Sequence, residues 1–460
     1  MAAAARLFCR QSYLRLMPPT KMTNPWLNRF AVLTAAATLV LLGAGGLVTS
    51  HGVGMAVPDW PNTYGYNMFL FPVSRWVGGI FYEHTHRLIA AFVGLLTAIL
   101  AAWLWVRETR GKPRWLGLGA IVFVLVLMGI RKLPVYVALT ALAAAVIGVG
   151  LYQFGRDTRQ LRWLGMVALA AVIVQGVLGG LRVVLYQDEI GIFHAALAQV
   201  FFVVVGAIAL LTSRWWGELG SPSTPLPSDG RGKHLSIALG RLRTLALATT
   251  GLILLQLILG ATMRHQHAGL AIPDFPLAYG KLWPAMDVNS VGAYNQQRLE
   301  VTAANPITSF QIGLQMAHRL VALAILICVG AVAWKARRWN SRFGVPPHNQ
   351  KRELRPPGLE TRAPLSRLAM MWLALILVQA GLGAWTIWSN KAADVATAHV
   401  LVGALSLVTG ALWCIISFRR LPGITEAKLA SKGGAVGESI REFARSTDSF
   451  HGDPATAMNK

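Results

Sequence analysis

The sequence predicts an all-α polytopic membrane protein with two pseudo-symmetric four-helix bundles, an inserted helical hairpin and about 10 spans. Three observations lead to this fold class. Hydrophobic residues make up 54% of the 460-residue chain and charged residues only 13%, a balance typical of proteins that lie largely in a bilayer. Apolar stretches of roughly 20 residues recur along the chain. Motifs of the first half also return in the same order in the second half.

The core spans are predicted from apolar stretches long enough to cross the hydrocarbon region as helices. They lie near 30–49, 85–106, 164–184, 192–212, 244–263, 309–334, 367–388 and 396–418. Between the second and third of these, residues 115–154 form a further apolar region that is interrupted by "RKLP". This region predicts a helical hairpin with a short first member. Two extra spans, rather than one, keep the charge pattern of the later loops consistent.

The net charge of +24 arises from Lys and Arg in short stretches between the apolar runs. With ten spans, the basic gaps all fall on one side of the membrane, which the positive-inside rule assigns to the cytoplasm. The tracts 213–243 and 335–367 are the longest of these gaps. Because the basic residues do not form a face on a soluble domain, no nucleic-acid partner is expected. The opposite, nearly balanced loops are 50–82, 185–191, 264–307 and 389–395.

Shifts in composition divide the chain into five segments. The predicted boundaries are a basic cytoplasmic N-terminal segment (1–28), an N-terminal bundle (29–212, with the hairpin 115–154), a cytoplasmic linker (213–243), a C-terminal bundle (244–420) and a flexible cytoplasmic tail (421–460). The first segment has no acidic residue, so it fits a cytoplasmic anchor, a mitochondrial transit peptide or an over-extended start. We favour a bacterial plasma membrane, with both termini cytoplasmic, over the mitochondrial inner membrane.

An internal repeat relates the two halves. "VPDWPNTYGY" (57–66) follows the first span, and "IPDFPLAYGK" (272–281) follows the seventh. "EHTHRL" (83–88) then corresponds to "QMAHRL" (315–320). Each repeat holds an even number of spans, so both halves enter the membrane in the same sense and are related by an axis along the membrane normal.

Two histidines recur in each half, near the outer ends of its second and fourth core helices. His86 corresponds to His318, and His194 corresponds to His399. In an up-down bundle these two helices are parallel, so their histidines can face one another across the interior. Neutral imidazole is a good axial ligand of haem iron, and the pattern predicts one haem site per half. The alternative is that each histidine only hydrogen-bonds a neighbouring helix. Small residues that would admit a flat macrocycle are Gly94, Gly179, Gly180, Gly260, Gly381, Gly383 and Gly403.

The halves differ three residues before the first histidine, where Glu83 corresponds to Gln315. A carboxylate can accept a proton or stabilise a developing cation, whereas an amide only hydrogen-bonds. The difference predicts a reactive first half and an auxiliary second half. Alternatively, Glu83 forms an ion pair with Arg87 one turn further along the helix. Arg87 and Arg319 could bind haem propionates through the guanidinium fork, or could extend to the membrane interface.

Taken together, these motifs resemble the haem A synthases, membrane enzymes that convert haem O to haem A for cytochrome oxidases. The likeness covers the eight core spans, about residues 29–420 apart from 115–154. It implies that His318 and His399 hold a permanent haem b, while His86 and His194 flank the site of the substrate haem O. Glu83 would then support oxidation of the C8 methyl group, through hydroxylated intermediates, to a formyl group. The expected partners are haem O, membrane lipid, a haem O synthase, an electron donor and a second copy of the chain.

Two features depart from the family pattern. Many members carry a cysteine pair in the first outer loop, but residues 50–82 contain none, and the hairpin 115–154 is additional. Two other classes remain open at this stage. A di-haem cytochrome b relaying electrons from quinol would also use four histidines, although its sites usually stack across the bilayer. A transporter of haem or a small molecule would explain the parallel repeats but not the paired histidines.

Overall fold

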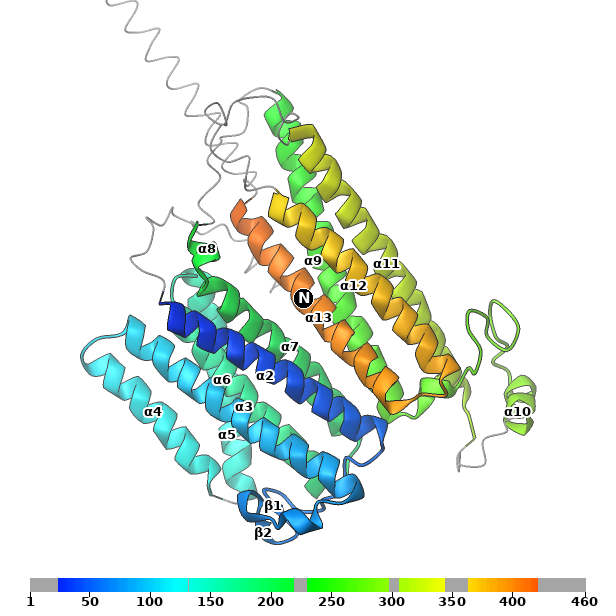
Figure 1. The fold of residues 1–460 in the computed structure, drawn as a ribbon, viewed down its shortest axis with the longest axis horizontal. Coiled ribbons are helices and arrows are strands. Elements are labelled where there is room, and N and C mark those ends of the chain that lie inside the picture. The colour runs from blue at the N-terminus through cyan, green and yellow to red at the C-terminus, as the bar shows by residue number, and fades with distance from the viewer. Residues whose placement is uncertain (1–23, 131, 219–229, 298–305, 344–362, 421–460) are drawn as a thin grey trace, which may run out of the picture.

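The computed structural model describes residues 24–130, 132–218, 230–297, 306–343 and 363–420, and helices dominate it (Figure 1). The long helices are α2 (Pro25–Ser50), α3 (Gly78–Glu108), α4 (Lys112–Met128), α5 (Leu133–Arg156), α6 (Leu161–Val184), α7 (Glu189–Leu211), α9 (Gly230–His265), α11 (Ser309–Phe343), α12 (Ala363–Trp388) and α13 (Ala393–Arg420). The short elements are β1 (Asn62–Thr63), β2 (Tyr66–Asn67), η1 (Met68–Leu70), η2 (Val73–Arg75), α8 (Arg214–Glu218), η3 (Ala268–Leu270) and α10 (Val288–Gln296).

Nine of the described helices are long and apolar enough to cross a bilayer. The tenth, α4, has 17 residues, which is near the lower limit for a span. The predicted class, an all-α polytopic membrane protein, is confirmed. Three buried hydroxyl groups are satisfied within their own helices, since Thr34, Thr38 and Thr97 each donate to the carbonyl four residues earlier.

Each half of the chain packs as four helices. The N-terminal group is α2, α3, α6 and α7, and the C-terminal group is α9, α11, α12 and α13 (Figure 1). Leu100, Leu104 and Phe201 lie in the buried core of the first group, and Trp372 and Trp413 lie in that of the second. The groups meet where α2 and α7 lie against α9 and α13, so the boundary between the halves is a packed helical interface.

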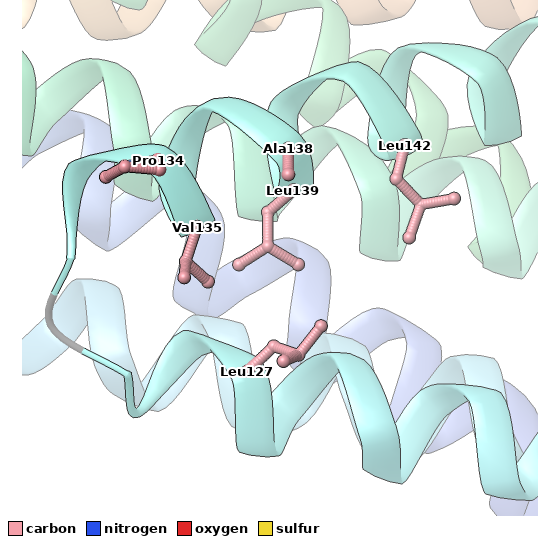
Figure 2. Close-up of a pocket in the computed structure, with 6 residues that line it drawn as sticks. All are labelled: Leu127, Pro134, Val135, Ala138, Leu139 and Leu142. Carbon is pink, nitrogen blue, oxygen red and sulfur yellow. The ribbon is translucent and has the colours of Figure 1, made fainter.

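The additional hairpin consists of α4 and α5, which lie outside α3 and α6 in Figure 1. Apolar side chains of α4, including Trp115, Phe123 and Val126, are exposed, as expected for a helix that faces lipid. A shallow apolar hollow of about 290 Å³, open to the surface, lies between the two helices (Figure 2). Its lining residues are Leu127, Pro134, Val135, Ala138, Leu139 and Leu142.

Two helix boundaries differ from those predicted. The fifth core helix, α9, begins at Gly230, so the expected linker 213–243 is shorter and also contains α8. The first core helix begins at Pro25, where Asn24 accepts hydrogen bonds from Trp26 N and Leu27 N and acts as its cap. Residues 1–23 of the predicted N-terminal segment and the tail 421–460 lie outside the described residues.

Candidate functional site

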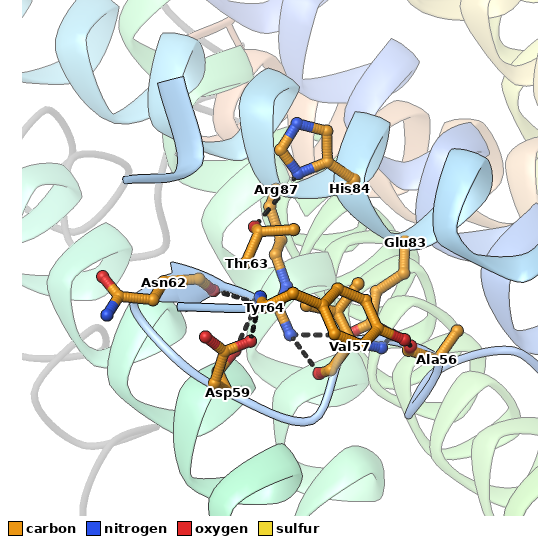
Figure 3. Close-up of polar contacts among 9 residues, drawn as sticks. All are labelled: Ala56, Val57, Asp59, Asn62, Thr63, Tyr64, Glu83, His84 and Arg87. Atoms are coloured by element: carbon orange, nitrogen blue, oxygen red, sulfur yellow. Dashed lines mark hydrogen bonds and ion pairs between the residues drawn. The ribbon is translucent and has the colours of Figure 1, made fainter. Parts of the chain in front are cut away.

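The loop between α2 and α3, predicted above as the first outer loop, contains a turn that is folded around the Asp59 carboxylate. Asp59 accepts a hydrogen bond from Tyr64 N at 2.7 Å, and the Tyr64 hydroxyl donates to Ala56 O (Figure 3). Asp59 also accepts from Gly65 N at 2.8 Å. Tyr64 and Gly65 both adopt positive φ, at 49° and 78°. A side-chain carboxylate that receives two successive backbone N–H groups fixes a tight turn.

The second outer loop repeats this arrangement. Asp274 accepts from Tyr279 N at 2.7 Å and from Gly280 N at 2.8 Å, and the Tyr279 hydroxyl donates to Ala271 O. Both loops also contain a cis peptide bond at the aromatic-proline step, Trp60-Pro61 and Phe275-Pro276. The repeat found in the sequence therefore extends to the backbone hydrogen bonds of the loops.

Arg87 ties the first loop to α3. Its Nη1 donates to Asp59 O at 2.6 Å and Asn62 O at 2.9 Å, and its Nη2 donates to Val57 O at 2.8 Å (Figure 3). The equivalent Arg319 donates to Leu277 O and Asp274 O. These contacts bring both guanidinium groups to the loops, and the propionate-binding role that the sequence suggested for them stays a prediction.

Glu83 anchors the same loop from the previous turn of α3. Its Oε2 accepts from Val57 N at 2.8 Å, and its Oε1 pairs with Arg87 Nη2 at 2.6 Å. Gln315 accepts from Ile272 N at 2.6 Å in the matching position. The ion pair between Glu83 and Arg87, one of the two roles predicted for Glu83, is therefore present. The two side chains share one structural task, but only the first half carries a negative charge there.

The four predicted ligand histidines each lie against a glycine of the preceding core helix. A Cβ atom added to Gly45 would lie 3.0 Å from His86 Cε1, closer than most real contacts. The corresponding pairs are Gly179 with His194 at 3.2 Å, Gly260 with His318 at 3.4 Å and Gly383 with His399 at 3.2 Å. The structure therefore contains one unit four times, a helical hairpin in which a glycine faces a histidine.

A glutamine four residues before the glycine supports the histidine in three of these hairpins. Gln175 Nε2 donates to His194 O at 3.0 Å, and Gln256 Nε2 donates to His318 O at 2.9 Å. Gln379 Nε2 lies 3.4 Å from His399 Nε2. The first hairpin has Leu41 in this position, so its histidine lacks this support.

Not every glycine singled out from the sequence faces a histidine. Gly179, Gly260 and Gly383 do, whereas Gly94 and Gly381 have open space where a Cβ would stand. Gly180 faces Trp60, and Gly403 faces Leu257 and Gln379. The sequence analysis did not single out Gly45. Its position relative to the end of α2 at Ser50 is the same as that of Gly260 relative to the end of α9 at His265.

The histidines of the second half form a facing pair. The ring centroids of His318 and His399 lie 6.5 Å apart, with an angle of 55° between the rings. Two imidazoles that share one metal ion, each through a nitrogen at about 2 Å, place their centroids roughly 6 to 7 Å apart. The spacing therefore fits two axial ligands of one iron.

The donor set also fits haem in both halves. The Nδ1 atoms of His86, His194, His318 and His399 are buried and have no hydrogen-bond partner within the described part of the chain. Buried polar atoms without a partner are costly in a protein interior, and a bound group can account for them. Among the described residues no group of three or more His, Cys, Asp or Glu side chains is placed to hold a metal ion.

The two loops are covered by different aromatic residues. Trp60 lies against Gly180 of α6 and packs on Tyr136 of the inserted hairpin, with ring centroids 4.7 Å apart. In the second half, Phe275 packs on Trp388 at 6.1 Å, and Trp388 Nε1 donates to Phe275 O. In the first half, Tyr136 of the inserted hairpin therefore packs on the loop aromatic residue, whereas in the second half Trp388 of α12 does so.

A polar cluster lies near the outer end of the interface between the halves. Arg182 of α6 donates to Asp188 at 2.8 Å, and His265 of α9 lies 3.7 Å from the same carboxylate. Burial acts to raise the pKa of Asp188, but the hydrogen bond and charge of Arg182 outweigh it and hold the pKa below its ordinary value. The cluster joins the two halves through an ionised carboxylate.

Fold and site together define a polytopic membrane protein with two four-helix groups, the second of which holds the facing pair His318 and His399. The chain belongs to the COX15-CtaA family of cytochrome oxidase assembly proteins, whose family model matches residues 128–411. The heme A synthase of Nitrosomonas eutropha is 23% identical over 410 residues, covering 83% of this chain and 90% of that protein. The heme A synthase of Lysinibacillus sphaericus is 22% identical over 316 residues, covering 68% and 76%.

Proposed function

We propose that this protein is a haem A synthase, an oxidoreductase that converts haem O to haem A for cytochrome oxidase assembly. The observation that carries the proposal is the facing pair His318 and His399, together with the glycine–histidine unit that recurs in the other half. Relatives that cover most of the chain and are named heme A synthase support the same reaction.

The proposal assigns different haems to the two halves. His318 and His399 would hold haem b, which when bound supplies electron transfer. His86 and His194 would flank the substrate haem O, whose C8 methyl group is oxidised through hydroxylated intermediates to a formyl group. We assign the substrate haem to the first half because Glu83 provides a carboxylate there, whereas the matching residue of the second half is the neutral Gln315.

In this proposal, Glu83 and Arg87 act on the substrate site through the first outer loop. Glu83 holds Val57 N, and Arg87 holds three loop carbonyls, so the loop is fixed across the outer end of the bundle. A fixed loop limits the entry of water and orients the substrate. Glu83 also provides a carboxylate three residues before His86 on α3, which can accept a proton as the methyl group is oxidised.

The proposed location is the bacterial plasma membrane, with both termini in the cytoplasm and the histidine sites toward the outer face. The distribution of Lys and Arg between the loops supports this orientation. The mitochondrial inner membrane is the alternative. A haem O synthase that supplies the substrate, an electron donor and a second copy of the chain are the proposed partners.

Haem analysis tests the proposal directly. The protein is co-expressed with a haem O synthase and purified in detergent, and its haems are extracted and identified by chromatography and mass. Haem A or hydroxylated haem O together with haem b is the expected result. Haem b alone, at two per chain, would instead establish the electron-relaying cytochrome, and a protein without haem would point to the transporter.

A further inference from the structure

Arg264 occupies an unusual position at the outer end of α9. It follows Gly260 by four residues, so both lie on one face of the helix, and Gly260 is the residue against which His318 packs. Its Nη2 crosses to the other half of the protein, where it donates to Gly46 O at 2.8 Å and to Ser50 Oγ at 2.6 Å. Gly46 directly follows Gly45, the residue that His86 contacts.

The surroundings of Arg264 include the helix of the second haem ligand as well. Ser50 Oγ lies 3.3 Å from the hydroxyl of Thr397, which stands two residues before His399 on α13. Arg264 therefore lies where α9, α2 and α13 meet, close to the outer ends of both histidine pairs.

No carboxylate neutralises Arg264 within the described part of the chain. Arg87 pairs with Glu83, and Arg182 pairs with Asp188, but the contacts of Arg264 are with a carbonyl and a hydroxyl. A cation inside a membrane bundle is costly unless an anion compensates it. Among its described contacts, only Nη2 hydrogen-bonds, so the rest of the guanidinium fork stays available.

We propose that Arg264 binds a carboxylate of the tetrapyrrole held by His318 and His399. The inference rests on the proposed function, because it takes the two histidines as ligands of haem. Haem carries two propionate groups, and a guanidinium matches a carboxylate in both charge and geometry. Arg319, the residue first expected in this role, is bonded to loop carbonyls instead.

The test uses the full chain, purified from cells that make haem b but no haem O. We expect Arg264→Gln to weaken retention of haem b by at least about tenfold, since one partner of a buried charge pair is lost. We also expect the midpoint potential of the remaining haem to become more negative, because a nearby positive charge favours the reduced state. Unchanged haem content and potential in Arg264→Gln would overturn the proposal.

Two further variants separate haem binding from helix packing. Ser50→Ala removes one of the two hydrogen bonds that Arg264 donates to α2 but keeps the cation, so wild-type haem content and potential are expected. If Ser50→Ala reproduced the losses of Arg264→Gln, Arg264 would only join the helices and the proposal would be wrong. Arg264→Lys keeps the charge, so its potential should remain near that of the wild type even if its haem binding is weaker.

A failure of the proposed function would look different. The wild type would then bind haem b normally but form no haem A when haem O is supplied, and the role of Arg264 would stand.

Discussion

Tyr136 of the inserted hairpin packs against Trp60 of the first outer loop, with their ring centroids 4.7 Å apart and their planes inclined at 55°. Tyr136 is 5% exposed, and Trp60 in turn covers Gly180, the neighbour of the glycine that faces His194. A hairpin outside the repeated core thereby contacts the loop that closes the N-terminal site.

Removal of the Tyr136 ring should impair the N-terminal site alone. We expect Tyr136→Ala to lower haem A formation by at least about tenfold, because the loop that orients the substrate loses its support. Tyr136→Phe keeps the ring and is the matched control, expected to retain most of the activity. The measurement is the ratio of haem A to haem b in the purified protein. A parallel fall in haem b would instead indicate general unfolding.

Replacement of Glu83 by the residue of the second half tests the chemical asymmetry. Glu83→Gln keeps an oxygen that can accept from Val57 N, so the loop should remain folded. We expect haem b to be bound normally and haem A formation to fall about 100-fold or more, as when a general base is lost. Extracted haems identified by mass provide the measurement. Wild-type haem A content in this variant would rule out a chemical role for Glu83.

Loss of His318 should remove the resident haem. We expect His318→Ala to lose the haem b absorbance, because one of the two facing imidazoles is missing. His84→Ala is a suitable control, since His84 contacts Thr63, Phe71 and Trp76 rather than a histidine partner. Full haem b absorbance in His318→Ala would contradict the ligand assignment.

The substitution Gly45→Ala should disturb the proposed substrate site. The added Cβ would lie 3.0 Å from His86 Cε1, so the imidazole must shift, and we expect haem O affinity to fall about tenfold, or ~1.4 kcal/mol. Gly94→Ala is the control, because no atom lies within 4 Å of its added Cβ. That variant should be neutral or stabilise α3 by up to about 1 kcal/mol. Titration of the detergent-purified protein with haem O measures both affinities, and equal values for the two variants would refute the role of Gly45.

Much of this architecture follows from the sequence alone. Apolar stretches determine which segments span the membrane, because the bilayer requires about 20 apolar residues per helix. The ordered repeat of His86, His194, His318 and His399 indicates that the halves are parallel copies with histidines at matching positions. Helix periodicity also places Glu83 and Arg87 on one face, where the ion pair forms.

The tertiary structure decided the partners of the polar groups. The sequence suggested propionates as partners of Arg87 and Arg319, and the fold adds partners that the sequence did not show, namely backbone carbonyls of the loops. The sequence pattern did not indicate that Arg264 would hydrogen-bond to the carbonyl of Gly46, which lies more than 200 residues earlier in the chain. Spacing along one helix reveals only which residues share a face, whereas these partners depend on how separate helices and loops pack together.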